Sequence, residues 1–471
     1  MNAPQKTDFS PNILERFFHL KELNTNFKVE LLAGVTTFLT MSYIIFVNPL
    51  FLSFFGDPDL RNLALPFSAS MTATCLASAL MCVFMGLWTN YPFALAPGMG
   101  LNAVVSYQMV LSLGLSWPQA MGVIVLEGIA ITILVISGLR EAVMNSIPMS
   151  LKQAISIGIG LFLAFIGLQN AGFVKAHPVT FVTLGDFTRW QVIISVFGLL
   201  ATAIMMKRKI KGALLLGIVL ATFFAVILNY LTGLSAFPEP GKAVIPKSVF
   251  SAPDLSTFGK FDFSVIAKLG LLPALMLIFS VMLSDFFDTL GSVIGLGTEG
   301  KFLNQKGNLP RVKQVLLVDS LAAVMGGVAS SSSVTTYIES AAGISAGGRT
   351  GFSAVVVGIL FFMAIFFSPL AGVVPKEATA PALIIVGFLM LTIIREIPFD
   401  KFEEAFPAFL IMIVMPMTYS ITNGIGFGFI SYTLIMLLSG KGKQVHLLMY
   451  LVSIAFTLNF LLPILKVVFK F

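Results

Sequence analysis

Two carboxylic acids interrupt a long apolar stretch, where an ionised side chain is energetically costly. Asp285 and Asp288 lie inside the apolar run 267–297, and their i, i+3 spacing predicts that they share one face of a helix. A carboxyl group removed from water favours its neutral form, so it can take up and release a proton near neutral pH. The alternative, a pair at a helix end facing lipid headgroups, is disfavoured because apolar residues continue on both sides.

A third acid, Glu339, stands in a polar segment, 330–351, that is flanked by apolar sequence. The segment has four consecutive serines and several glycines, so it is a poor candidate for an ordinary membrane-spanning helix. Irregular backbone at membrane depth is tolerated only where protein buries it or where it lines a wet cavity, and an ionisable residue there points to function. We therefore interpret this segment as half of a substrate site. The competing interpretation is an ion pair of Glu339 with Arg349.

Two further acids lie in apolar stretches. Asp319 either hydrogen-bonds between helices or takes part in proton coupling, and the residues leave both roles open. Glu127 is more typical of an acid that ties helices together, and we place it outside the site.

A second broken segment precedes these acids in the chain. Pro97, Gly98 and Gly100 interrupt the apolar run 92–110. Proline lacks the backbone donor and glycine permits unusual dihedral angles, so backbone N–H and C=O groups become free to face a ligand. A simple helix kink is the alternative. The two breaks lie at similar distances from the start of their halves of the chain, which is the pattern of a transporter binding site.

The elements that must position these residues are membrane-spanning helices. The chain of 471 residues is 57% hydrophobic and only 11% charged, whereas soluble domains are about a quarter charged. Apolar runs of spanning length recur throughout, which favours a helical bundle over a β-barrel. The net charge of +7 indicates no nucleic-acid partner, because the basic residues cluster between apolar runs. The expected spans are 29–53, 67–88, 92–110, 117–138, 148–170, 190–206, 212–233, 267–297, 314–330, 333–348, 351–373, 379–394, 405–420 and 422–439.

Charge between the spans predicts their orientation. Basic clusters at 207–211 and 441–443 fall on one side, and acidic or mixed segments at 56–59 and 234–264 fall on the other, which places the N-terminus in the cytoplasm. With seven spans in each half, the second half starts on the opposite face, so the halves would be inverted repeats. The residues leave open whether the last apolar stretch, 446–468, crosses the membrane.

A resemblance to a known family rests on three motifs, FALAPGMGLNA at 93–103, SDFFDTLG at 284–291 and TTYIESAAG at 335–343. They resemble motifs of the nucleobase:cation symporter-2 family (the xanthine/uracil permease superfamily), and more narrowly of its adenine/guanine/hypoxanthine permease branch. The segment 157–172 fits the same family. The resemblance covers most of the chain, from about 29 to 440.

The resemblance implies an all-α polytopic membrane fold of fourteen transmembrane segments in two inverted seven-segment repeats. Spans 3 and 10 would be broken by short β-strands. A core domain would carry the substrate, and a gate domain would form the face of a homodimer. The implied divisions are a cytoplasmic N-terminal lead at 1–28, a core domain at 29–138 and 265–373, a gate domain at 139–233 and 374–440, an extracytoplasmic loop at 234–264, and a C-terminal apolar segment at 441–471.

The resemblance also assigns residues. Asp288 takes the position of the span-8 substrate-binding acid, Glu339 that of the span-10 acid or amide, and Asp319 that of a span-9 acid needed for activity. The residues expected to bind substrate are Asp288, Glu339, Phe93, Ala94, Ala96, Gly98, Thr336, Tyr337 and Ser340. Those expected to couple protons are Asp285, Asp288, Asp319 and Glu339. The serine run 330–333 departs from the more mixed Gly/Thr/Ser sequence of the family, which would alter selectivity.

The expected function is proton-coupled uptake of purine nucleobases across the bacterial cytoplasmic membrane, with the core domain sliding against the gate domain. An ionised Glu339 favours the N1–H edge of guanine or hypoxanthine over adenine. Alternative substrates are uracil, xanthine or an inorganic anion, although an anion site would present a cation rather than two acids. A channel would line a continuous pore, and an enzyme would need a nucleophile–base pair or metal cluster. We expect no cofactor and no metal; the expected partners are the nucleobase, the proton and the lipid bilayer.

Overall fold

The computed structural model describes residues 13–138, 146–237, 241–304 and 309–469. Residues 1–12 of the expected N-terminal lead and residues 139–145 at the start of the expected gate domain lie outside this description. Among the described residues, 11 helices are long and apolar enough to cross a membrane. The chain is therefore a multi-pass, mostly helical membrane protein.

The first half contains long helices, one short strand and a two-stranded hairpin. Their bounds are α1 (Ile13–Phe18), α2 (Phe27–Met41), α3 (Ile44–Leu52), η1 (Phe54–Gly56), η2 (Pro58–Leu60), α4 (Phe67–Thr89), β1 (Leu95–Pro97), α5 (Met99–Ala103), η3 (Val104–Ser112), α6 (Trp117–Ser137), α8 (Met149–Asn170), β2 (Val174–His177), β3 (Phe181–Leu184), α9 (Trp190–Lys207) and α10 (Ala213–Leu231).

The second half repeats the pattern of long helices with one short strand. Its elements are α11 (Val265–Leu269), α12 (Leu271–Glu299), α13 (Val312–Ala329), β4 (Val334–Thr336), α14 (Ser340–Ser345), α15 (Gly351–Ala364), η4 (Ile365–Phe367), α16 (Ser368–Gly372), α17 (Lys376–Leu391), η5 (Thr392–Glu396), α18 (Phe402–Thr418), α19 (Ile421–Leu438), η6 (Gly442–Gln444) and α20 (Leu447–Phe469).

Helix ends coincide with residues that satisfy the free backbone groups of a first or last turn. Asn26 accepts a hydrogen bond from Val29 N at the start of α2. Ser116 and Gln119 form a reciprocal capping box at the start of α6. Asn90 ends α4 with a left-handed conformation, at φ 53°. Local sequence thus defines these boundaries.

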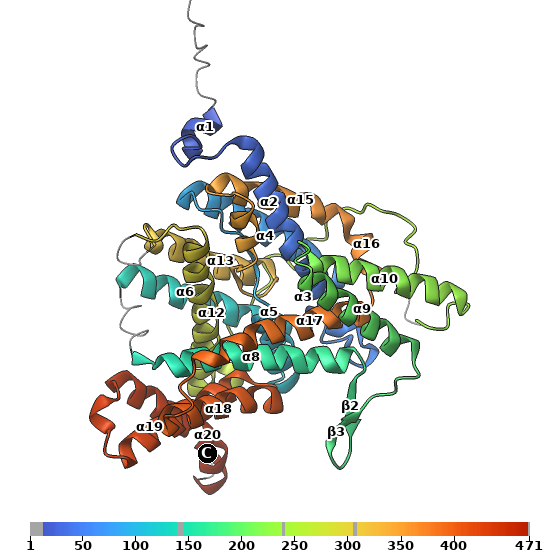
Figure 1. The fold of residues 1–471 in the computed structure, drawn as a ribbon. Coiled ribbons are helices and arrows are strands. Elements are labelled where there is room, and N and C mark those ends of the chain that lie inside the picture. The colour runs from blue at the N-terminus through green and yellow to red at the C-terminus, as the bar shows by residue number, and fades with distance from the viewer. Residues whose placement is uncertain (1–12, 139–145, 238–240, 305–308, 470–471) are drawn as a thin grey trace, which may run out of the picture.

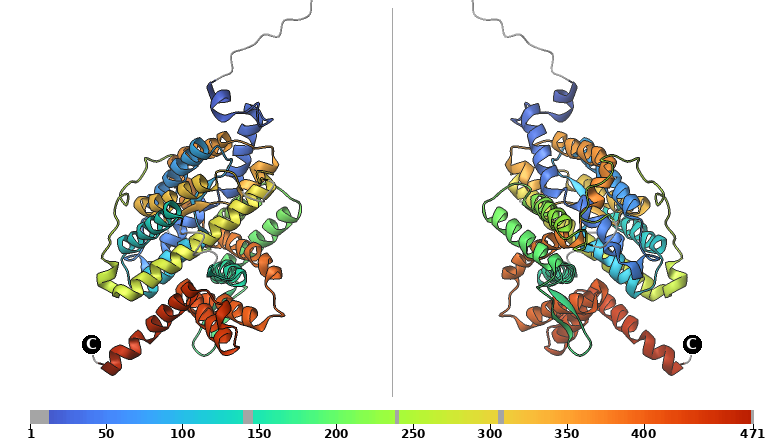
Figure 2. Two further views of the ribbon diagram at one scale, coloured as in Figure 1. Left: turned by 90° about the vertical axis from the view of Figure 1, so that its left-hand side faces the viewer. Right: turned by 90° about the vertical axis from the view of Figure 1, so that its right-hand side faces the viewer.

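The helices form two groups, and each group takes helices from both halves of the chain. In the first group α15 packs on α4 and α2, and α13 packs on α6 and α4. In the second group α17 packs on α8 and α9, and α18 packs on α8 and α19. The first group, α2–α6 with α12–α16, is the upper body in Figure 2, and α18–α20 lie below it. Figure 1 shows α8 and α17 crossing the middle of the molecule, between these parts.

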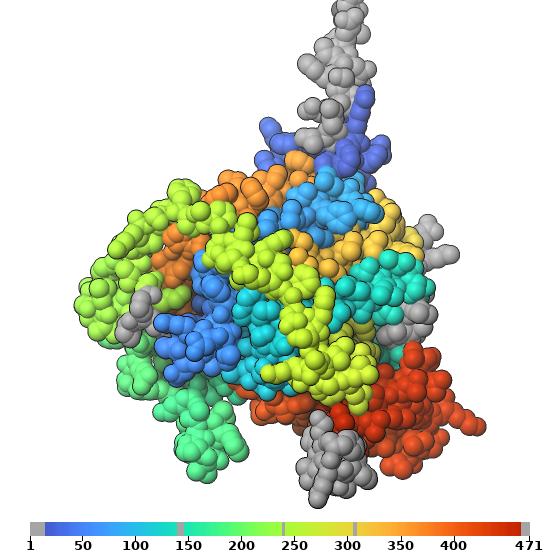
Figure 3. All heavy atoms as spheres, turned by 180° about the vertical axis from the view of Figure 1, so that it is seen from behind, coloured from blue at the N-terminus to red at the C-terminus, as the bar shows by residue number. Residues whose placement is uncertain are grey.

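A long segment between α10 and α11 lies over one face of the first group (Figure 3). Ser68 on α4 donates a hydrogen bond to Asp254 Oδ2, at 2.7 Å. Asp262 N donates to Pro118 O at 2.9 Å and Gly259 N to Val328 O at 2.8 Å. These bonds fasten the segment across α4, α6 and α13.

The two broken segments meet as an antiparallel strand pair. Leu95 pairs with Thr336, Ala96 with Thr335 and Pro97 with Val334. Beyond the ladder, Gly98 N donates to Ser333 O and Tyr337 N to Ala94 O, both at 2.9 Å. Backbone groups that the sequence suggested would face a ligand therefore largely bind each other, because unpaired backbone groups are costly away from water.

Small residues allow the helices of the first group to touch through their backbones. Gly86 on α4 and Gly351 at the start of α15 approach so closely that a Cβ on either would overlap the carbonyl oxygen of the other. Asn90 Oδ1 accepts a hydrogen bond from Gly351 N at 2.8 Å, which fixes the same junction. A side chain at either glycine would push α4 and α15 apart.

We predict that Gly86→Ala destabilises the purified protein by about 1–3 kcal/mol, the usual cost of overpacking. The measurement is the midpoint of thermal unfolding in detergent, determined by fluorescence-detected size-exclusion chromatography. Gly372→Ala on α16 is the matched control, because a Cβ there meets nothing within 4 Å. Equal midpoints for Gly86→Ala and wild type would contradict the close packing of α4 and α15.

Candidate functional site

A cavity of about 90 Å³ lies between the two groups of helices. Most of its polar side chains come from α12, the α2–α3 turn and the junction of β4 with α14. Helices α8, which adds Ser156, and α17 close it from the second group. Its lining comprises Tyr43, Met99, Gly100, Leu101, Ser156, Ile159, Ser284, Asp288, Ser292, Thr336, Tyr337, Ile338, Glu339, Val386 and Met390.

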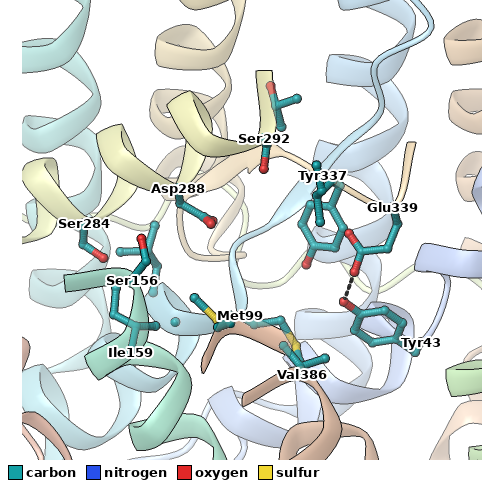
Figure 4. Close-up of a pocket in the computed structure, with 15 residues that line it drawn as sticks. Tyr43, Met99, Ser156, Ile159, Ser284, Asp288, Ser292, Tyr337, Glu339 and Val386 are labelled. Carbon is teal, nitrogen blue, oxygen red and sulfur yellow. Dashed lines mark hydrogen bonds between the residues drawn. The ribbon is translucent and has the colours of Figure 1, made fainter. Parts of the chain in front are cut away.

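Asp288 reaches the cavity from α12. Ser284 and Ser292 lie one helical turn on either side of it, and all three line the cavity, so one face of α12 forms this wall. In Figure 4 the Asp288 carboxyl group points into the space opposite Tyr337 and Glu339.

Glu339 reaches the same cavity from the residue before α14. Its Oε1 accepts a hydrogen bond of 2.6 Å from the Tyr43 hydroxyl, drawn as a dashed line in Figure 4. Its backbone oxygen accepts one from Thr40 Oγ1 at 3.3 Å. The expected competitor, Arg349, instead donates through its guanidinium to Ile344 O at 2.8 Å and Gly348 O at 2.7 Å. Glu339 is therefore held by helix α2 and the turn that follows it.

Asp319 lies behind the cavity wall and holds β4 in place. Its Oδ1 accepts from Thr336 N at 2.8 Å and from Thr336 Oγ1 at 2.7 Å. Its Oδ2 accepts from Thr289 Oγ1 at 2.6 Å, and the hydroxyls of Thr289 and Thr335 are 2.7 Å apart. Of the two roles left open by the sequence, these contacts favour hydrogen bonding between elements.

Thr336 and Tyr337 line the cavity together with Asp288 and Glu339, but the remaining residues expected to bind substrate lie behind its wall. Ala94 N donates to Ser340 Oγ at 2.9 Å, and Ala96 lies within the strand pair. Phe93 is fully buried and stacks on Tyr91 at a centroid distance of 5.0 Å. Gly98 N is bonded to Ser333 O. The residues that lie behind the cavity wall and hold its elements in place are Phe93, Ala94, Ala96, Gly98 and Ser340.

Asp285 does not share the cavity face with Asp288, in contrast to the expectation from their spacing. Its Oδ2 accepts a hydrogen bond of 3.3 Å from Ser333 Oγ, next to β4. The carboxyl group of Glu127, on α6, lies beside it. Helix α12 therefore presents one acid to the cavity and the other to α6 and β4.

Sequence reasoning missed Tyr43 and the contributions of α8 and α17. Tyr43 has a signal in retrospect, because Thr36, Thr37, Thr40 and Ser42 make the sequence before it unusually polar for a span. The structure breaks the first span there, with α2 ending at Met41 and α3 beginning at Ile44. Ser156, Ile159, Val386 and Met390 lie in unbroken apolar helices that carry no such signal.

A second set of contacts joins the two groups of helices away from the cavity. Gln108 on η3 donates through Nε2 to Thr422 Oγ1 at 2.6 Å, and its Oε1 accepts from Ile421 N at 2.8 Å. We call these three residues the Gln108 latch. Beside it, the rings of Tyr107 and Tyr419 lie 5.6 Å apart. The latch fastens η3 of the first group to the first turn of α19 in the second.

Comparison with known proteins agrees with this architecture. A sequence model described as "Permease family" matches residues 28–427. The guanine/hypoxanthine permease PbuG of Bacillus subtilis is 41% identical over 95% of this chain and 99% of its own length. The adenine permease AdeP of Escherichia coli is 40% identical over 95% of this chain and 96% of its own length.

Solved structures with a similar fold include the transmembrane domain of the cyanobacterial bicarbonate transporter BicA. Its TM-score is 0.59 at 15% identity, and the match covers 84% of this chain and 97% of that domain. This similarity concerns the fold alone. Because the family match spans most of the chain and the relatives align along nearly their whole length, the protein belongs to the permease family, the nucleobase:cation symporter-2 family that its motifs indicate, and is a transporter rather than an enzyme.

Proposed function

We propose that the protein imports purine nucleobases together with protons, and that it favours guanine and hypoxanthine over adenine. The observation that carries the proposal is that Asp288 and Glu339 line one cavity from different elements. The names of the relatives, which are guanine/hypoxanthine and adenine permeases, support a purine substrate.

The cavity offers acceptors to a ring that carries N–H donors along its edges. A carboxylate can accept two neighbouring N–H groups in a bidentate, charge-assisted pair. Glu339 would take the N1–H edge of guanine or hypoxanthine, and Asp288 the opposite edge. Tyr337 would pack against the flat ring, with its hydroxyl anchored on Pro97 O at 2.5 Å.

Tyr43 supports the preference for guanine and hypoxanthine. Its hydroxyl donates to Glu339 Oε1, so this oxygen acts as an acceptor. A carboxylate fixed as an acceptor matches the N1–H of guanine and hypoxanthine, whereas N1 of adenine is itself an acceptor. The mismatch would leave two acceptors facing each other in a site with little water, which is unfavourable.

We assign the fold to fourteen spans in two inverted repeats, with the N-terminus in the cytoplasm of a bacterial cell and the chain in its inner membrane. The first group of helices would be the core domain that carries the substrate. The second group would be the gate domain, through which two copies form a dimer. The interleaving of both halves in each group supports this division. The extracytoplasmic side then holds the loop 234–264 and the Gln108 latch.

An elevator-type movement follows from this assignment. The latch binds the core element η3 to the gate helix α19 on the outer side, so the outer entrance is closed while it is formed. The core domain would slide along the gate domain, break the latch and present the cavity to the outside. Protonation of an acid would accompany loading of the nucleobase.

An inorganic anion is a weaker candidate despite the fold shared with the bicarbonate transporter. An anion site would present a cation or free backbone N–H groups to its ligand. Here two acids line the cavity, and the strand backbones largely bind each other. Uracil and xanthine carry N–H donors as purines do, so competition must separate them.

Competition for uptake tests the substrate assignment. We expect unlabelled guanine to inhibit labelled hypoxanthine uptake, in a host lacking purine transport, about tenfold or more strongly than adenine. The basis is one lost hydrogen bond to a charged group, worth about 1.5–3 kcal/mol. Uracil and xanthine complete the panel. Stronger inhibition by adenine than by guanine would refute the role given to Glu339, and inhibition by bicarbonate alone would refute a nucleobase substrate.

Replacement of Asp288 tests the second acid. We expect Asp288→Asn to reach the membrane in normal amount but to lose hypoxanthine uptake, because an amide presents only one acceptor oxygen to the N–H edge of the nucleobase. Asp400→Asn, the same change at an exposed loop position, should transport normally. Undiminished proton-driven uptake by Asp288→Asn would exclude a central role for this residue.

Loss of the latch should expose the cavity to the outside. Gln108→Leu removes two hydrogen bonds, each worth about 0.5–1.5 kcal/mol, so we expect the outward-open population to rise roughly tenfold. The reporter is a cysteine at Met99 in the cavity wall, labelled from outside with a membrane-impermeant maleimide. Gln314→Leu, at an exposed position on α13, is the control. Equal labelling rates in the two backgrounds would mean that the latch does not hold the outer side closed.

A further inference from the structure

Glu127 and Asp285 form an acid pair in which three oxygens lack a donor. Glu127 and Asp285 are both fully buried. Among the described residues, no hydrogen-bond donor reaches Glu127 Oε1, Glu127 Oε2 or Asp285 Oδ1. The Glu127 carboxyl group lies beside the Asp285 carboxyl group and near the Ser333 hydroxyl. The two acids thus face each other, and three of their four oxygens accept no bond.

Two other buried acids among the described residues, Glu30 and Asp319, have donors on both carboxyl oxygens, in contrast to the pair. Glu30 Oε1 accepts from Arg349 N at 2.8 Å, and its Oε2 accepts from Ser353 Oγ at 2.6 Å. Asp319 receives bonds on both oxygens. Both of these acids tie elements together, and both are provided with donors. Glu127 and Asp285 lack them.

A single proton would resolve the arrangement. Two neighbouring carboxylates removed from water cannot both stay ionised, because their charges repel and neither is hydrated. A proton bound to one of them removes one charge and turns that group into an O–H donor to the other. The short, charge-assisted bond that results supplies the missing donor.

The charges around the pair favour such a proton. Asp319 and Asp288 are the further acids whose fields reach Asp285. The lysines of the elements packed on α6 and α12 lie towards helix ends: Lys268 and Lys313 are exposed, and Lys152 on α8 stands over the Phe287 ring at 5.9 Å. The local field is therefore negative.

The pair is joined to the cavity through α12 and β4. Ser333 Oγ donates to Asp285 Oδ2, and Ser333 O accepts from Gly98 N, so one residue binds both the acid pair and the other broken segment. β4 follows Ser333 and ends at Thr336, in the cavity wall. Asp285 also precedes Asp288 by less than one turn of α12. The pair is therefore connected to two walls of the cavity, through α12 and through Ser333 before β4.

We propose that Glu127 and Asp285 share one buried proton, and that this pair is the proton site coupled to the nucleobase site. The inference rests on the proposed function, and it adds Glu127, which the sequence placed outside the site. The proton comes from water on one side of the membrane and adds to a carboxylate oxygen. It leaves to water on the other side, and no other bond forms or breaks. Without the proton, the two carboxylates repel each other. The hydrogen bond between Ser333 and Asp285 then shifts, and β4 shifts with it.

Purified protein in liposomes separates coupling from binding. Exchange of labelled for unlabelled hypoxanthine at equal pH needs no net proton movement, whereas accumulation driven by a pH gradient does. We expect Glu127→Gln to keep exchange but to accumulate hypoxanthine only to a concentration ratio of unity, because the amide supplies the donor permanently. Glu127→Asp should recover part of the accumulation. Glu299→Gln, the same change at an exposed position of α12, should behave as wild type.

The outcomes distinguish this inference from the proposed function. Wild-type protein that neither exchanges hypoxanthine nor accumulates it would refute the proposed function itself. Accumulation by Glu127→Gln equal to wild type would overturn the shared proton alone. Where Glu127→Gln fails to fold, infrared spectra of the wild type at neutral pH decide: we expect the band of a buried protonated carboxyl group, weakened in Asp285→Asn. Absence of that band in the wild type would overturn the proposal.

Discussion

The arrangement of this protein depends on how backbone polar groups are satisfied in the middle of a membrane. Two segments leave the helical hydrogen-bond pattern, and each such group would be costly in lipid. They satisfy each other as the β1–β4 pair, and Asp319 fastens that pair to α12 and α13. The pairing places Tyr337 and Glu339 in the cavity wall and Ser333 beside Asp285. Both proposed sites thus depend on six paired strand residues.

The supply of donors separates the buried acids into kinds. Glu30 and Asp319 receive protein donors on both oxygens and serve as fixed points of the fold. Glu339 receives one bond from a side chain, Tyr43, and lies in a cavity where a ligand can supply the rest. Glu127 has no hydrogen-bond donor on either carboxyl oxygen, and Asp285 has none on Oδ1. Because a buried acceptor without a donor is costly, such groups are retained where something transient satisfies them.

The sequence predicted the breaks and the approach of Asp288 to Glu339, since prolines, glycines and a serine run at membrane depth leave few other interpretations. The sequence did not predict which face of α12 carries Asp285. Residues at i and i+3 are separated by about 60° around a helix, so a pair can straddle the boundary between two walls. Ser284 and Ser292, one turn from Asp288, continue the cavity face, whereas Thr289, one turn from Asp285, bonds Asp319. Which wall each faced depended on packing partners that no local pattern encodes, and so did the pairing of Glu127.

The geometry of α12 bears on how two sites can act as one. A helix is stiff over one turn, so Asp285 and Asp288 cannot move independently. In the proposed mechanism, a charge placed on one side of α12 would reposition groups on the other side together with β4, which bonds near Thr289 on one side and lines the cavity through Thr336 on the other. The proposed elevator movement adds a reason for separation. The nucleobase site must open to water on alternate sides, while a proton held behind the wall stays out of reach of the substrate. Placing Asp288 and Asp285 on different faces of α12 meets both requirements.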